Sequence, residues 1–213
     1  MVTPNKSKYS DGLGLNIRKH SYSMEQTFVM IKPDGVKRGL AGEIIRRFER
    51  MGLKIVAMKM VSAKDEILLK HYNADDPKTL QRWGEKTLKT YTQYGKDAKK
   101  DLGTDDPQEL GKMVKGWLFD YVKSGPMIAM ILEGKHAVDN VIATAGPTMP
   151  VQAPAGTIRG DYSTDSAAYA NNEKRGVMNL VHISASLEEA NVEKALWFTP
   201  EEIQDYKRAE ELI

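Results

Sequence analysis

The stretch "FVMIKPDG", residues 28–35, decides the fold because it contains a buried strand and the turn that ends it. Residues 28–31 are apolar without interruption, and Pro33, Asp34 and Gly35 directly afterwards favour a turn. Apolar residues then recur at helical spacing across 40–51, with arginines and a glutamate between them and Gly52 just past the end. The sequence therefore predicts a buried strand followed by an amphipathic helix.

The rest of the chain continues this alternation of strands and helices. Further strands are expected at 53–61, 127–132 and 177–184, and further helices at 66–72, 107–123, around 136–145 and at 187–198. Ser186 with Glu189 three residues later matches a capping box for the last helix. Four strands with two helices on one face predict an α+β fold, a ferredoxin-like split βαββαβ sandwich with an inserted helical segment.

Three segments do not fit this pattern. The polar residues 1–23 are interpreted as a flexible N-terminal tail, which leaves 24–213 as a single domain. Residues 73–110 are charged with scattered aromatics, and we expect an insertion of surface helices that carry little of the core. A long loop is expected at 146–176, with a second insertion within 162–176, and loops of that length are usually functional or disordered.

The composition limits the classes of partner. The chain has 213 residues, and 31 lysines and arginines nearly balance 29 aspartates and glutamates. A net charge of +2 gives no general reason to expect nucleic acid or membrane binding, so any anion site must be local. The absence of cysteine excludes disulfides and thiolate metal sites and fits a reducing compartment, and a cytoplasmic location is expected.

His182 stands inside the last predicted strand, in "NLVHISAS" (179–186). A lone strand histidine is usually a hydrogen-bonded core residue, but its neighbours matter here. Ser184 points to the same face of an extended strand, and Glu193 lies about two turns into the next helix, which returns toward the strand. A carboxylate there could accept the proton of one ring nitrogen and leave the other free as a nucleophile.

Two cationic residues are candidate phosphate contacts. Lys32 ends the first buried strand, where its side chain can reach a phosphate at the sheet edge. Arg159 lies between glycines in "GTIRGDYS", in the loop that follows Thr148, and a guanidinium suits phosphate oxygens. Taken singly, a lysine that leaves the core and a solvated loop arginine are the ordinary explanations.

Other functional motifs are absent or have a simpler explanation. The chain has no G-x-x-x-x-G-K-[ST] loop, no G-x-S-x-G elbow and no aromatic motif of the RNA-binding ferredoxin-like modules. A metal site formed by His71 with Asp75 and Asp76 is conceivable, but a polar surface insertion explains these residues better.

Four separated segments resemble nucleoside diphosphate kinases in type and in order. They are "TFVMIKPDGVKRGLAGEIIRRFERMGLKIVAMKM", "SGPMIAMILEG", "AGTIRGDYS" and "NLVHISASLEEANVEKALWFTPEEI". The resemblance implies ping-pong transfer of the γ-phosphate of a nucleoside triphosphate to a nucleoside diphosphate through a phosphohistidine. It also implies Mg²⁺ bound mainly through nucleotide phosphates, with no dedicated metal ligands. Family members are homo-oligomers, hexamers or tetramers built from dimers, with no requirement for nucleic acid or membrane.

The resemblance also implies roles for individual residues. His182 would be the nucleophile, with Glu193 orienting its ring and Ser184 hydrogen-bonding nearby. Lys32 and Tyr72 would contact the transferred phosphoryl group. The remaining phosphates and the ribose would be held by Arg159, Thr148 and Asn179.

The sequence departs from the family at the other end of the site. Ile142 stands where the family usually has a second phosphate-binding arginine, which Lys112 or Lys115 could replace. Val114 aligns with the aromatic residue that stacks on the base, and Trp117 on the same helical face could replace it. These departures leave open an alternative, a catalytically impaired relative that binds nucleotide or a partner.

Two further details bear on the last strand. Ala185 stands where the family commonly has aspartate. Asn179 and His182 are three residues apart, so a regular strand would face them oppositely. If both reach the nucleotide, a bulge or an irregular strand end is required.

Overall fold

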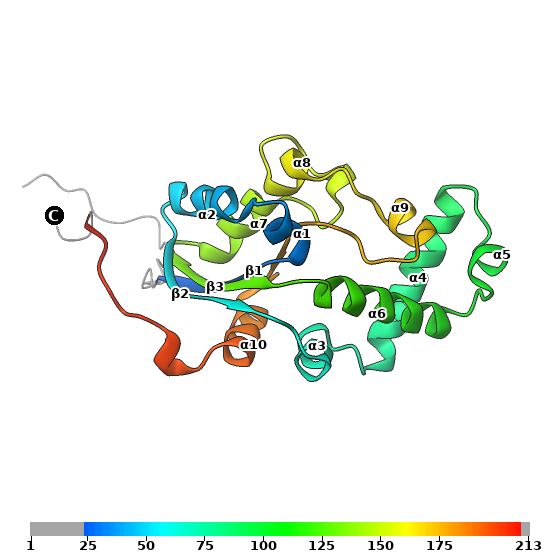
Figure 1. Cartoon of the computed structure of the whole chain (residues 1–213), viewed down its shortest axis with the longest axis horizontal. Helices are drawn as coiled ribbons and strands as arrows, with labels where there is room; N and C mark the ends of the chain where they lie inside the picture. Colours follow the sequence, from blue (N-terminus) through cyan, green and yellow to red (C-terminus); the bar gives the residue numbers. More distant parts are fainter. Residues whose placement is uncertain (1–23, 210–213) are drawn as a thin grey trace, which may run out of the picture.

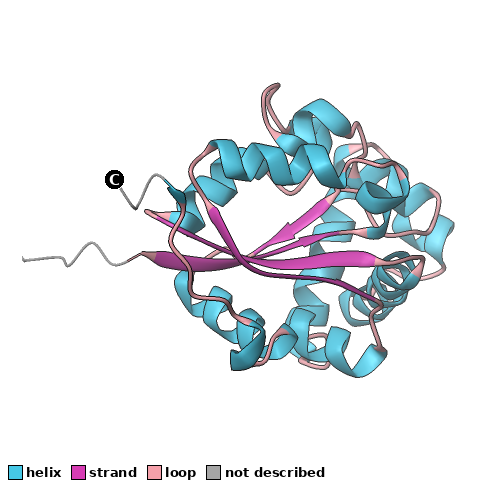
Figure 2. Ribbon diagram, turned by 60° about the vertical axis from the view of Figure 1, so that its left-hand side comes forward, coloured by secondary structure: helices cyan, strands magenta, loops and turns pink. Residues whose placement is uncertain are grey.

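The computed structural model describes residues 24–209, so the predicted tail at 1–23 lies outside the described residues. Four strands form one antiparallel sheet in the order β2-β3-β1-β4, which confirms the ferredoxin-like α+β fold (Figures 1 and 2). The strands are β1 (Glu25–Ile31), β2 (Lys54–Val61), β3 (Met127–Gly134) and β4 (Val181–Ile183).

Helices cover both faces of this sheet, whereas the sequence pattern placed two helices on one face (Figure 2). One face packs against α2 (Ala41–Arg50), α7 (Ala137–Ala145) and α8 (Ile158–Tyr162). The opposite face packs against α3 (Asp65–Tyr72), the end of α6 (Pro107–Lys123) and α10 (Leu187–Trp197). The remaining elements are α1 (Pro33–Lys37), α4 (Pro77–Gln93), α5 (Ala98–Leu102), α9 (Ala167–Asn172) and 3₁₀ turns at Pro150–Gln152 and Pro200–Glu202.

The apolar run of β1 is explained by this two-sided cover. Phe28 and Met30 belong to the core on the α3/α10 side, and Val29 and Ile31 belong to the core on the α2/α7 side. All four side chains are fully buried. Because successive side chains of a strand point to opposite faces, a central strand between two helical layers has no polar side.

β4 is shorter than expected, since only Val181–Ile183 form a strand where 177–184 was predicted. The chain bends sharply just before it. Leu180 has a positive φ of 69°, and the amide of Val181 donates to the carbonyl of Asn179 at 2.7 Å. This is the irregular strand end that Asn179 and His182 require in order to face the same site. β4 forms one edge of the sheet and pairs with β1.

The segment 73–110 is more ordered than expected of surface helices. α4 packs along α6, and together with α5 they enclose a third apolar cluster around Tyr91, Ala98, Leu102 and Leu110. The expectation that this segment carries little of the core is therefore wrong. These helices gather at the end of the molecule away from β2 (Figure 1).

The predicted long loop at 146–176 also contains structure. It includes a 3₁₀ turn, α8 and α9, and the two helices are N-capped by side chains. Thr157 caps α8 by accepting from the amide of Gly160, and Ser166 caps α9 by accepting from the amide of Tyr169. The polar composition that suggested a loop thus includes capping residues of short helices. Within 24–209, no helix is both long and apolar enough to cross a bilayer.

Candidate active site

A cleft of about 840 Å³ opens beside the start of β4, between α4, α6, α7 and the segment that follows α7. Its volume falls in the range of small-molecule sites. Nine of the residues singled out in the sequence line it: Lys32, Tyr72, Val114, Trp117, Ile142, Thr148, Arg159, Asn179 and His182. Ser184 and Glu193 lie behind the histidine, both almost fully buried.

His182 is held from behind by a carboxylate. Its Nε2 lies 2.6 Å from Oε1 of Glu193, and Oγ of Ser184 donates to Oε2 of the same carboxylate at 2.5 Å. The three residues meet because Ser184 follows His182 on the same face of β4 and α10 runs back under the sheet. The structure therefore brings these three predicted residues together.

The electrostatics keep the ring of His182 neutral. Burial, together with the positive charges of Lys32 and Arg159, lowers its pKa to about 3. In the tautomer with hydrogen on Nε2, that hydrogen is donated to Glu193, and the lone pair of Nδ1 is left for reaction. Burial also raises the pKa of Glu193 above its ordinary value.

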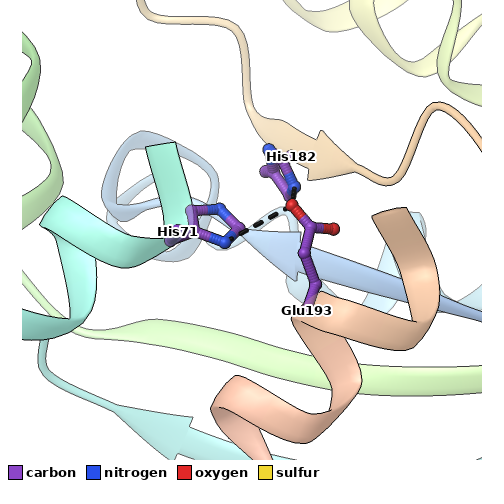
Figure 3. A group of neighbouring side chains, drawn as sticks. All are labelled: His71, His182 and Glu193. Atoms are coloured by element: carbon purple, nitrogen blue, oxygen red, sulfur yellow. Dashed lines mark hydrogen bonds and ion pairs between the residues drawn. The ribbon is translucent and has the colours of Figure 1, made fainter. Parts of the chain in front are cut away.

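His71 is the site residue that sequence reasoning missed. Its side chain is fully enclosed, and its Nδ1 lies 3.4 Å from Oε1 of Glu193, so the carboxylate stands between two imidazoles (Figure 3). The two rings meet edge to face with centroids 4.2 Å apart. Trp197 donates to the same Nδ1 at 3.3 Å, and burial lowers the pKa of His71 well below its usual value. The available signal was its place directly before Tyr72, at the end of a helix that packs on the sheet.

Lys32 is positioned by the irregular start of β4. Its ammonium donates to Oδ1 of Asn179 at 2.8 Å, and its backbone amide donates to the carbonyl of Leu180. The side-chain amide of Asn179 donates in turn to the carbonyl of Thr148 at 3.0 Å. Burial and the charge of Arg159 lower the pKa of Lys32 to about 8, against the opposing influence of Asp34.

Arg159 is buried and makes three hydrogen bonds to main-chain carbonyls. Its guanidinium donates to Asn179 at 3.3 Å, to Val181 at 2.8 Å and to Gly146. Burial lowers its pKa to about 10, so it remains charged at neutral pH. A guanidinium has five N–H groups, so donors remain for a ligand in the cleft.

Tyr72 lines the cleft, and Tyr121 lies behind it against Asp34. The hydroxyl of Tyr72 is buried without a hydrogen-bond partner among residues 24–209, and burial raises its pKa above the ordinary value. An unpartnered buried hydroxyl at the cleft is a candidate ligand contact. Tyr121 instead donates to Oδ1 of Asp34 at 2.6 Å, while Oδ2 accepts from the amide of Leu180. Asp34 thereby holds the bend before β4.

The outer end is apolar and more open. Val114 and Trp117 of α6 line it, and Ile142 of α7 lines it with 36% of its surface exposed. Neither Lys112 nor Lys115 is among the lining residues, and Lys115 pairs with Asp75 at 3.4 Å. The two lysines therefore do not supply a cation near Ile142.

Ala185 lies at the cleft, and its backbone amide donates to Glu189 at 2.7 Å. Ser186 caps α10 by accepting from the amide of Glu189, which is one half of the predicted capping box. The other half of the predicted capping box is absent, because the carboxylate of Glu189 accepts from the amide of Ala185 instead of the amide of Ser186.

His71, His182 and Glu193 also form a group of potential metal ligands, with donor atoms within 4.8 Å of one another. The short distance between Glu193 and His182 is that of a hydrogen bond and needs no ion to explain it. Asp75 and Asp76 are not part of this group. Of the described residues that line the cleft, Glu189 is the single carboxylate, so the lining offers no cage of oxygen ligands.

The fold and site together define a class: a ferredoxin-like α+β protein with a neutral histidine, backed by a carboxylate, that faces an anion-binding cleft. The profile of the family described as nucleoside diphosphate kinase matches residues 25–83 and 108–203. The chain belongs to this family of phosphotransferases.

The relatives agree along most of their length. A nucleoside diphosphate kinase from Pyrobaculum aerophilum is 49% identical over 180 residues, which covers 84% of this chain and 98% of the relative. The nucleoside diphosphate kinase of Archaeoglobus fulgidus is 37% identical over 188 residues, 88% of this chain and 95% of the relative.

Solved structures of the family are similar as well. The crystal structure of an NDP kinase from Pyrobaculum aerophilum has a TM-score of 0.81 at 48% identity, with 86% of this chain and all of that chain covered. A nucleoside-diphosphate kinase from Borrelia burgdorferi, a transition state mimic with bound vanadate and ADP, has a TM-score of 0.69 at 32% identity. The match covers 88% of this chain and 95% of that one.

Proposed function

We propose that the protein is an active nucleoside diphosphate kinase that transfers the γ-phosphate of a nucleoside triphosphate to a nucleoside diphosphate by way of phosphorylated His182. The observation that carries this proposal is the neutral imidazole held by Glu193 at the wall of a cleft that also contains Lys32 and Arg159. Family membership supports the same reaction.

In the first half-reaction, Nδ1 of His182 attacks the γ-phosphorus of the triphosphate. The N–P bond forms while the bond from phosphorus to the β,γ-bridging oxygen breaks, and the diphosphate leaves with that electron pair. Glu193 accepts the hydrogen bond from Nε2 and stabilises the positive charge that develops on the ring. A neutral ring needs no base to remove a proton first.

The second half-reaction reverses the first with a different diphosphate. A terminal β-phosphate oxygen of the acceptor attacks the phosphorus, the N–P bond breaks, and its electron pair returns to Nδ1. Because the same cleft receives both nucleotides in turn, donor and acceptor never need to be bound together, which is a ping-pong sequence.

The inner residues neutralise charge in this scheme. Lys32 and the free hydroxyl of Tyr72 contact the transferred phosphoryl group, since both lie at the histidine end of the cleft. Ser184 fixes the carboxylate of Glu193 by donating to it, and His71 packs beside Glu193 and against the ring of His182. Preorganised donors of this kind are usually the largest contribution to phosphoryl-transfer rates.

The other residues of the cleft bind the rest of the nucleotide. Arg159 and Thr148 contact the remaining phosphates, and Asn179 contacts the ribose hydroxyls. Val114 and Trp117 provide the apolar surface for the base, and Ile142 contributes an apolar wall in place of a charge. The proximity of all six to one cleft supports this arrangement.

We also propose that Mg²⁺ is the cofactor and enters with the nucleotide. The cationic lining suits an ion that is held through nucleotide phosphates rather than by the protein. When bound, the ion would neutralise phosphate charge. The assembly proposed for the chain is a homo-oligomer, a hexamer or tetramer built from dimers, which light scattering of the purified protein would test.

The function is tested by incubation with γ-labelled ATP and magnesium. Wild type should acquire an acid-labile label and pass it to several nucleoside diphosphates, and His182→Ala should acquire none. An impaired relative would bind nucleotide without exchanging phosphate. An unlabelled wild type, or full labelling of His182→Ala, would refute the proposal.

A further inference from the structure

The helix α4 forms a wall of the cleft, and most of it lies outside the family match. The match stops at residue 83 and resumes at 108, whereas α4 spans Pro77–Gln93. Trp83, Lys86, Thr87 and Thr90 of α4 nevertheless line the same cleft as His182. These positions follow helical spacing, so one face of α4 is turned toward the site.

Two glycines fix this wall against α6. A Cβ atom added at Gly84 would lie 1.9 Å from the carbonyl oxygen of Pro107, and one at Gly111 would lie 2.1 Å from the carbonyl oxygen of Leu80. The backbones of α4 and α6 therefore approach closely at two points. Only glycine permits so close an approach, and it sets how near α4 lies to α6 at the cleft.

The charges that line the cleft are not equally available. Lys32 donates to Asn179, and Arg159 donates to three carbonyls. Arg175 is paired with both Asp165 and Glu173. Lys86 is exposed, and within the described part of the chain its ammonium makes no ion pair or hydrogen bond.

We propose that α4 adds a subsite to the cleft, in which the ammonium of Lys86 contacts the phosphate chain of the bound nucleotide. This inference rests on the proposed function for the identity of the ligand. Lys86 supplies positive charge in a cleft that Ile142 and Val114 also line without contributing any. An exposed, unpaired lysine can reorient toward a phosphate without breaking an existing contact.

The test is the affinity for ADP, measured by titration calorimetry with the full chain and no turnover. Lys86→Gln should weaken binding roughly 3- to 10-fold and Lys86→Glu more, while Lys86→Arg should keep most of the affinity. Lys89 is a matched control, because it is an exposed lysine of the same helix that does not line the cleft. Lys89→Gln and Lys89→Glu should bind ADP like wild type.

Unchanged ADP affinity in Lys86→Glu overturns the subsite, as does equal weakening in Lys89→Glu, which would mark a general field effect. The labelling of His182 at saturating ATP separates this result from the proposed function. Lys86→Gln should still acquire the label, since Lys86 lies outside the inner end. A wild-type protein that acquires no label refutes the kinase reaction. In that case, weaker ADP binding in Lys86→Gln but not in Lys89→Gln would still support the subsite.

Discussion

The two ends of the cleft are built in different ways. The inner end consists of Lys32, Arg159, His182 and Glu193. These residues lie at or against the central sheet, and their polar atoms form hydrogen bonds with other side chains and with the backbone. The outer end is formed by α4, α6 and α7, where Ile142 and Lys86 are exposed. The polar groups of the inner end are thus held by one another, whereas side chains of the outer end are open to solvent.

The largest effect is expected at the carboxylate of the inner end. Glu193→Ala removes the hydrogen-bond partner of Nε2, so the ring loses its fixed tautomer and the charge that balances it. We expect the turnover rate to fall by about 10²- to 10⁴-fold. Steady-state kinetics should show the loss mainly in kcat, and thermal unfolding would report on stability. Near wild-type kcat would mean that the inner end does not depend on this contact.

Lys32 should give the next largest effect and a pH signature. With its pKa lowered to about 8, the free protein loses this positive charge as pH rises above that value. We expect kcat/KM to fall on the alkaline side of pH 8, and Lys32→Gln to lower it by roughly 10²- to 10³-fold at neutral pH. Lys32→Arg stays charged and should move the alkaline limb upward. A pH profile identical in wild type and Lys32→Arg would contradict the assignment.

A substitution at Gly84 should affect the outer end of the cleft and leave the chemistry of the inner end intact. The methyl group of Gly84→Ala would meet the carbonyl of Pro107, so α4 must shift. We expect a loss of about 1–3 kcal/mol in stability, which denaturant unfolding would measure. Nucleotide affinity should weaken while labelling of His182 at saturating ATP persists. Gly116 of α6 faces open space and is the control, since Gly116→Ala should cost no stability.

The smallest effect is expected at His71, which packs beside Glu193 and the ring of His182 but does not line the cleft. His71→Asn should lower kcat a few-fold and leave KM for the nucleotide nearly unchanged, because Glu193 and His182 lose packing on one side only. His71→Gln, with its longer side chain, should keep more of the wild-type rate than His71→Asn, as steady-state kinetics would show. A change in KM alone would show that His71 acts on binding instead.

Much of the inner end of the cleft could be predicted from the sequence, because it follows from the periodicity of side chains along strands and helices. The period of two places Ser184 on the face of His182, and the helix that follows returns Glu193 to the strand. The contact between His71 and Glu193 could not be predicted, since it joins α3 to α10 on one face of the sheet and no pattern in either segment specifies that pairing.

The outer end was less accessible to sequence reasoning for the same reason. The charged composition of 73–110 predicts surface helices but not the buried contact between α4 and α6. The two glycines that bring α4 against α6 are informative only once the partner backbone is known. The spacing of Asn179 and His182 indicated that the strand must be irregular near Leu180. The form of the bend could not be predicted, because it depends on a hydrogen bond to Asp34, which is distant in the sequence.

One contact of Arg159 has a consequence for solubility. β4 is an edge strand, and edge strands offer free main-chain groups that can pair with another molecule. The guanidinium donates to the outward carbonyl of Val181, whose own amide is already satisfied by Asn179. A side chain thus takes the place that a neighbouring strand would fill, so Arg159 shields this edge of the sheet from pairing with another molecule.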